Sequence, residues 1–147
     1  MTTSALVKPL IFGAIDGMTC AIGVILSLHH HAGLVFAGAF GVAVAEFVGM
    51  GAGEWLSDEN PHGFTSSAAI GAASAIGAVL PALPYLMTSG ALAIAMSVTV
   101  LIVVCGLISV ARAEQRGFGR AVLETYGVLA VVFAAVLGSG LLTPGGS

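Results

Sequence analysis

The chain has 147 residues, of which 58% are hydrophobic and 7% are charged, whereas about 25% of the residues of an ordinary soluble domain are charged. Its four Lys and Arg against seven Asp and Glu give a formal net charge of −3, with no basic tract to attract nucleic acid. This composition excludes a nucleic-acid-binding protein and predicts an all-α polytopic membrane protein.

Five apolar runs each approach or exceed the ~20 residues that a helix needs to span a membrane. They cover approximately residues 9–28, 33–56, 64–87, 90–111 and 121–142. The breaks between them hold His, Pro, Gly, Ser, Thr or Arg residues and are too short to form a domain. We therefore predict five transmembrane helices in a single transmembrane domain over residues 1–147.

The basic residues predict how these helices are oriented. Lys8 precedes the first helix, and Arg112, Arg116 and Arg120 follow the fourth, so that all four lie on one side of a five-helix zigzag. Basic residues favour the cytoplasmic side. We expect the N-terminus to be cytoplasmic and the C-terminus to lie on the opposite side.

The first predicted helix carries one acidic residue, Asp16, and Cys20 follows one turn later on the same face. A carboxylate near the middle of a spanning helix costs roughly 2.5–3.5 kcal/mol on insertion scales, so it normally faces a cavity or a partner and marks an ion path. Cys20 is either a small buried hydrophobe or an auxiliary soft ligand, whereas Cys105 in the fourth helix is expected to be a buried hydrophobe.

Three residues of the second predicted helix, Glu46, Met50 and Glu54, lie four apart and therefore form one stripe. Counted from the predicted cytoplasmic helix ends at ~1.5 Å per residue, Asp16 and Met50 are level, Glu54 lies at the cytoplasmic mouth and Glu46 lies deepest. We predict that these four side chains are metal ligands arranged as a ladder. The alternatives are packing for Met50 and an interfacial position for Glu54.

The ligand types indicate which ion would bind. Carboxylates alone suit magnesium or calcium, whereas a thioether favours a transition metal such as ferrous iron or manganese. Protonation of the carboxylates would release the metal, so proton-coupled antiport is expected. The transported metal and protons are then the ligands, and no permanently bound cofactor is expected.

Small residues predict close helix packing. The patterns Gly13-x-x-x-Gly17 and Gly49-x-x-x-Gly53 allow helix backbones to approach each other. Because five helices enclose little volume, we expect a homodimer with a shared translocation path. The alternative is that these glycines pack helices within one subunit.

Other features have weaker functional interpretations. Pro81 and Pro84 predict a kink, or a hinge, at the end of the third helix. The histidines 29–31 form either a solvated turn or a metal site at the exit, and the acidic turn 57–63 either gathers cations or is an ordinary loop. Glu124 is expected to be interfacial. No catalytic or nucleotide-binding motif is visible, so the chain is not expected to be an enzyme and no catalytic residues are assigned.

At these residues the chain resembles the vacuolar iron transporter family. Residues 12–17, Phe-Gly-Ala-Ile-Asp-Gly, are similar to the first-helix motif of that family, and residues 45–57 are similar to its second-helix signature. Residues 80–86, Leu-Pro-Ala-Leu-Pro-Tyr-Leu, and the Arg-containing turn before the fifth helix extend the resemblance over nearly the whole chain.

The resemblance implies a five-helix dimer that moves ferrous iron, and often manganese, out of the cytoplasm in exchange for protons. It implies metal contact by Asp16 and Met50, and an acidic role in the path for Glu46 and Glu54. Many family members carry a long helical insertion between helices two and three, which here is replaced by residues 57–63. This minimal form favours a prokaryotic inner or plasma membrane and leaves the route of metal capture open.

Two rival functions remain at this stage. A non-transporting membrane scaffold or metal-binding partner subunit would bind metal without flux. A small proton-coupled exporter of organic cations would use the acidic residues but would not need Met50.

Overall fold

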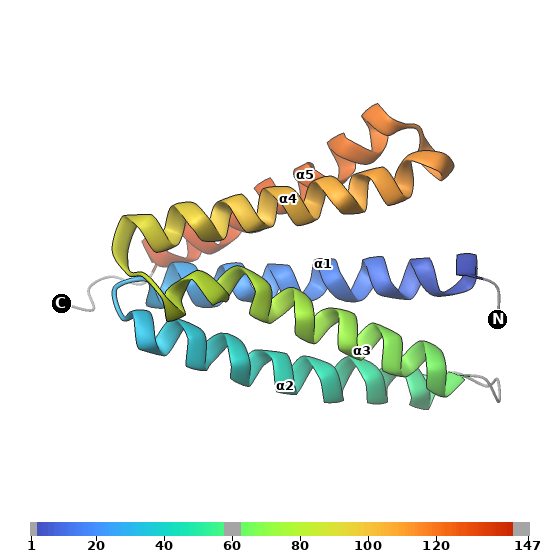
Figure 1. Cartoon of the computed structure of the whole chain (residues 1–147), viewed down its shortest axis with the longest axis horizontal. Coiled ribbons are helices and arrows are strands. Elements are labelled where there is room, and N and C mark those ends of the chain that lie inside the picture. The colour runs from blue at the N-terminus through green and yellow to red at the C-terminus, as the bar shows by residue number, and fades with distance from the viewer. Residues whose placement is uncertain (1–2, 58–62, 143–147) are drawn as a thin grey trace.

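The computed structural model describes residues 3–57 and 63–142, and all of its regular elements within those ranges are helices (Figure 1). Five helices are long and apolar enough to span a membrane. This confirms the predicted all-α class and the five helices of membrane-spanning length and apolarity. The elements are α1 (Thr3–Leu28), α2 (Ala32–Ser57), α3 (Gly63–Val79), the 3₁₀ segment η1 (Leu80–Leu86), α4 (Gly90–Arg116) and α5 (Phe118–Leu142).

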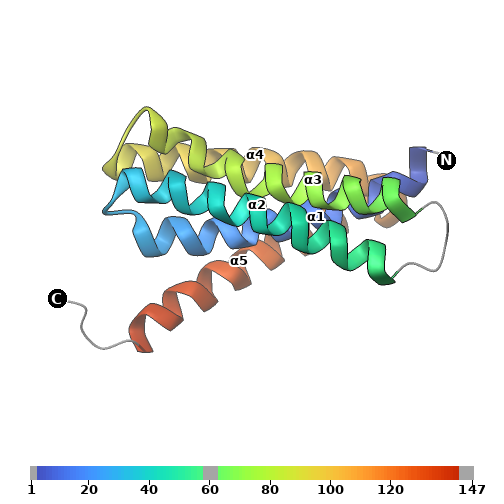
Figure 2. The same ribbon diagram turned by 90° about the horizontal axis from the view of Figure 1, so that it is seen from below.

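The helices run roughly along one long axis, and α3 packs against both α1 and α2 (Figure 1). Helices α4 and α5 form an antiparallel pair on the other side of α1, and α5 slants away from the bundle toward its end (Figure 2). The beginning of α1 and the end of α5 lie at opposite ends of the molecule (Figure 1). This is the arrangement expected for an odd number of spans.

The contact between α1 and α3 depends on glycine. A Cβ atom at Gly13 or Gly17 would collide with the backbone of α3 at Ile70 and Ser74, and one at Gly77 would collide with the backbone of α1. Without side chains at these positions the two backbones come close together. The Gly13-x-x-x-Gly17 motif therefore packs helices within one subunit, which is the second of the two interpretations given for these glycines.

Helix boundaries differ from the predictions at the start of α1, at the end of α4 and at the start of α5, which begins at Phe118 instead of near residue 121. Helix α1 begins at Thr3 and includes Pro9, at which the predicted helix started. Helix α4 continues to Arg116, through residues predicted to be a loop. The residues beyond Ala111 are mostly strong helix formers, and the helix ends only where Gly117 adopts a φ of 78°, a left-handed conformation that glycine tolerates.

The third predicted helix, residues 64–87, is divided into two parts. The α-helical hydrogen bonding ends at Val79, and Leu80–Leu86 forms a 3₁₀ segment around Pro81 and Pro84. Each proline lacks a backbone donor, so the regular α-helical pattern cannot continue through this segment. Both prolines are buried, with Tyr85, at the end of the bundle that holds the turn between α1 and α2.

The close contact between α1 and α3 generates the first prediction. We expect Gly17→Ala to lower the melting temperature of the detergent-solubilised protein by several degrees, because overpacking a tight contact costs about 1–3 kcal/mol. Gly23→Ala is the matched control on the same helix, since nothing lies within 4 Å of a Cβ there. Equal melting temperatures for the two variants would show that the contact is not tight.

Candidate metal centre

Three potential metal ligands from α1 and α2 meet inside the bundle. One ligand atom from each of Asp16, Cys20 and Glu46 lies within 4.8 Å of the other two, and all three residues are partly buried. Asp16 and Cys20 come from consecutive turns of α1, and Glu46 comes from the facing helix α2. Two carboxylates and one thiol therefore point into the same small volume.

Hydrogen bonds hold the carboxylate of Glu46 on both of its oxygens. The Cys20 thiol donates to Oε1 at 3.1 Å, and the Ser74 hydroxyl of α3 donates to Oε2 at 2.9 Å. Ser74 is fully buried. Because all three helices contribute to this arrangement, the position of Glu46 depends on the packing of α1, α2 and α3 together.

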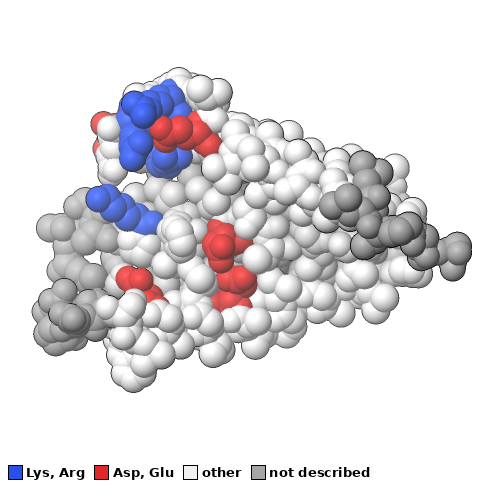
Figure 3. Space-filling view, turned by 180° about the vertical axis from the view of Figure 1, so that it is seen from behind, with Lys and Arg blue, Asp and Glu red and all other residues white. Residues whose placement is uncertain are grey.

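The pair of carboxylates is positioned well inside the helix ends. Measured along the helices at ~1.5 Å per residue, Asp16 lies about 20 Å from the start of α1 and Glu46 about 17 Å from the end of α2. Acidic side chains reach the surface at this level on one face of the bundle (Figure 3). In a membrane, that face would expose charge to the hydrocarbon unless something covers it.

The order of the predicted ladder changes in the structure. Asp16 is level with Glu46, and Met50 lies one helical turn, about 6 Å, closer to the end of α2. The reason is that α1 begins six residues before Pro9, so that counting from Pro9 underestimates the depth of Asp16. Glu54 lies a further turn along α2, where the Ser66 hydroxyl donates to its Oε1 at 3.4 Å.

Two participants were not among the predicted ligands. Cys20 was considered only as an auxiliary ligand, although its position four residues after Asp16 on the same face was a usable signal. Ser74 gave no signal, because a serine in an apolar, small-residue helix is common. Only the packing of α3 places its hydroxyl against Glu46.

The other sequence candidates do not join this group. The ring centroids of His29 and His30 lie 3.8 Å apart with the rings tilted by 42°, and the His29 Nδ1 atom lies 2.9 Å from the carbonyl oxygen of Leu26. Among the described residues, the histidines at this turn form no set of three ligands. Most of the acidic turn, with Asp58, Glu59 and His62, lies outside the described residues.

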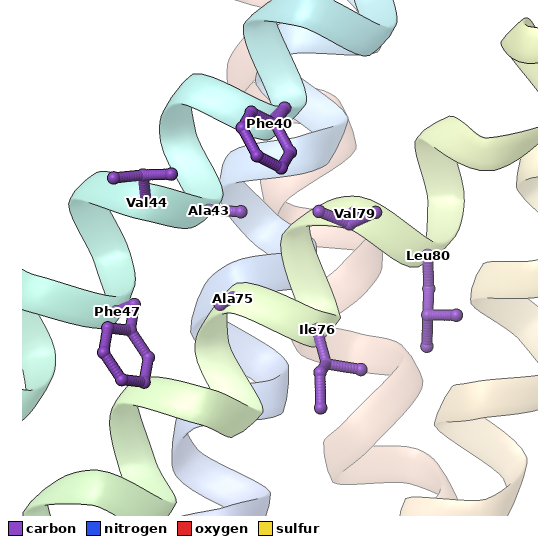
Figure 4. Close-up of a pocket in the computed structure, with 8 residues that line it drawn as sticks. All are labelled: Phe40, Ala43, Val44, Phe47, Ala75, Ile76, Val79 and Leu80. Atoms are coloured by element: carbon purple, nitrogen blue, oxygen red, sulfur yellow. The ribbon is translucent and has the colours of Figure 1, made fainter.

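A cavity separate from this group is lined wholly by apolar residues. It has a volume of about 470 Å³ and lies between α2 and α3 (Figure 4). Its lining residues are Phe40, Ala43, Val44, Phe47, Ala75, Ile76, Val79 and Leu80. Without a polar side chain in its wall, this groove offers no ligand to a cation and suits only apolar groups.

The donor set determines what the centre can bind. Two close carboxylates away from bulk water repel each other unless a cation or a proton lies between them. A thiol that loses its proton adds a soft ligand, which favours borderline transition metals over magnesium or calcium. Three protein ligands would leave coordination positions open for water or a further ligand.

Comparisons of the chain with protein-family models, with curated proteins and with solved structures find no match. The resemblance to the vacuolar iron transporter family therefore rests on the sequence motifs alone.

Cys20 provides a spectroscopic test of the centre. We expect Co²⁺ added to the purified protein to give a sulfur-to-metal charge-transfer band in the near ultraviolet, and Cys20→Ser to abolish it. Cys105→Ser is the matched control, because Cys105 is buried in an apolar cluster with Leu101 and Ile108. Loss of the band in both variants, or in neither, would argue against Cys20 as a ligand.

Proposed function

We propose that this protein is a proton-coupled transporter that moves a divalent transition metal, ferrous iron or manganese, out of the cytoplasm. The observation that carries the proposal is the convergence of Asp16, Cys20 and Glu46 within 4.8 Å. Placing two carboxylates together in an apolar bundle is costly, and in membrane proteins such groups usually serve ion movement. The metal is the substrate, and protons are the coupling ion.

The stripe on α2 supports a path from the centre toward one end of the bundle. Met50 and Glu54 follow Glu46 at intervals of one turn, and both are partly exposed. An ion entering past Glu54 would meet a carboxylate, then the thioether of Met50 and then Glu46, at steps of about 6 Å. Several weak sites in series allow an ion both to bind and to leave.

Proton coupling follows from the same residues. A carboxylate holds either a metal ion or a proton, because protonation removes the charge that binds the cation. After the metal is released on the far side, protonation of Asp16 and Glu46 would neutralise both carboxylates. The empty site could then return to the cytoplasmic side without an uncompensated buried charge. In this scheme protons move opposite to the metal.

A homodimer would cover the exposed side of the centre. The outer face of α2 consists of exposed small residues at one-turn intervals, Ala37, Gly41 and Ala45, and continues with Gly49 and Gly53. Nothing lies within 4 Å of a Cβ at Gly41, Gly49 or Gly53, so the structure leaves this face open for another helix. A second copy packed here would shield the acidic residues from lipid and share the path.

The resemblance to vacuolar iron transporters agrees with this proposal and supplies the choice of metal and the direction. The gathering of Lys8, Arg112 and Arg116 around one pocket supports a cytoplasmic position for that end of the bundle. Glu54 lies on α2 toward its end, Ser57, which is the side at which metal would enter.

The transport prediction is tested in proteoliposomes under anoxic conditions, with an internal pH dye. We expect ferrous iron entry to be accompanied by opposite proton movement. Asp16→Asn and Glu46→Gln should each lower the initial rate of entry by about tenfold or more, because each removes a charged ligand. Met50→Leu should lower it less, since it removes one neutral ligand.

Matched controls separate these effects from general damage. Glu114→Gln removes an exposed carboxylate from α4, and Met96→Leu removes an exposed thioether from the same helix. Both controls should transport at the native rate. Metal binding to the native protein without any flux of iron or manganese would instead favour the non-transporting scaffold. Transport of organic cations at the same rate by the native protein and by Met50→Leu would favour the organic cation exporter.

The dimer interface is tested by filling its small-residue face. We expect the native protein to be a dimer by size-exclusion chromatography with light scattering in mild detergent, and Gly49→Leu to shift it toward monomer. Gly127→Leu is the matched control on α5, because it too has nothing within 4 Å of a Cβ. A native monomer, or a dimer that tolerates Gly49→Leu, would contradict this interface.

A further inference from the structure

A pocket separate from the metal centre lies between α1, α4 and α5, near the turn that joins α4 to α5. Its volume is about 580 Å³. One part of its wall is charged and the other part is apolar. None of its lining residues belongs to the Asp16, Cys20 and Glu46 group.

The charged part of the wall carries more positive than negative groups. Lys8, Arg112 and Arg116 line it with a single carboxylate, that of Glu124. The Lys and Arg side chains lie at one end of the molecule, in one cluster and one smaller separate area (Figure 3). Lys8 is exposed and has no ion pair among the described residues, so the pocket keeps an excess of positive charge.

The guanidinium group of Arg112 is held in a fixed position. Its Nη2 atom lies 2.6 Å from Glu124 Oε2, and its Nη1 atom donates to the Thr125 hydroxyl at 3.0 Å. Glu124 also faces Arg116 at 3.5 Å and Arg120 at 2.9 Å. Within the pocket wall, the single carboxylate of Glu124 cannot neutralise Lys8, Arg112 and Arg116 together, which leaves capacity for a second anion.

The apolar part of the wall continues from the charged part toward the middle of the bundle. On α1, Phe12 and Ile15 follow Lys8 by one and two turns, and on α5, Val128 follows Glu124 by one turn. Phe12 is 58% exposed and lines the pocket, so its ring is accessible to a ligand there. The pocket thus has a cationic end near the helix termini and an apolar end at greater depth.

A pocket with a cationic end and a deeper apolar end matches a ligand that has an anionic headgroup and an apolar chain. We propose that the pocket binds an acidic glycerophospholipid, whose phosphate lies against Lys8, Arg112 and Arg116 while its acyl chains lie against Phe12, Ile15 and Val128. Basic pockets between transmembrane helices bind anionic lipid headgroups, and anionic lipids are abundant in the cytoplasmic leaflet. A soluble anion would use the cationic end alone. The inference does not depend on metal transport.

The test measures lipid binding by the purified full-length protein in detergent. Phosphatidylglycerol is titrated and the melting temperature is followed, with phosphatidylcholine of the same acyl chains as the zwitterionic comparison. We expect Lys8→Gln and Arg116→Gln each to raise the apparent Kd for phosphatidylglycerol about fivefold, and the double variant about thirtyfold. Both residues are exposed, so the variants should keep the native melting temperature in phosphatidylcholine.

Arg120→Gln is the matched control, because Arg120 contacts Glu124 but does not line the pocket. It should change the Kd less than twofold. An equal loss in Arg120→Gln, or equal stabilisation by both lipids, would overturn the proposal in favour of a general surface-charge effect. If inorganic phosphate at the same concentration stabilises the protein as well as phosphatidylglycerol does, the pocket is a soluble-anion site and the lipid assignment is wrong.

Discussion

The close packing of α3 against α1 and α2 determines the rest of the structure. Glycines 13, 17 and 77 let α1 and α3 touch through their backbones, and Gly71 does the same for α3 and α2 at Phe47. Because α1 and α2 both pack on α3, their relative depth is set by a common neighbour. This is the arrangement that places Asp16 beside Glu46 and brings Ser74 to the same carboxylate.

The energetic consequence is an acidic centre that one subunit does not fully enclose. In water a partly exposed pair of carboxylates is inexpensive, but in hydrocarbon it is costly. The open small-residue face of α2 and the apolar groove beside it, lined by Phe40 and Phe47, are surfaces on which another helix or a lipid chain can pack. The cost of leaving Asp16 and Glu46 unshielded is thus the physical reason for expecting a dimer.

The two charged regions of the molecule have opposite characters. The centre near Asp16 is acidic and lies deep between helices, whereas the pocket near Arg112 is basic and lies at the helix ends. Charges at the ends of spanning helices meet lipid headgroups and water, while charges at depth require a specific partner. In our proposals a metal ion or protons bind at the acidic centre, and a lipid phosphate binds at the basic pocket.

Sequence alone predicted the number and class of the helices, because the length of an apolar run and its few charges follow directly from the thickness of a bilayer. It also identified Asp16 and Glu46, since an acidic residue within such a run stands out. It did not predict that Asp16 is level with Glu46, or that the Cys20 thiol and the Ser74 hydroxyl donate hydrogen bonds to the Glu46 carboxylate. It also did not predict that α4 continues to Arg116. Those features depend on helix starts and on backbone contacts between segments far apart in the chain, and only tertiary packing determines them.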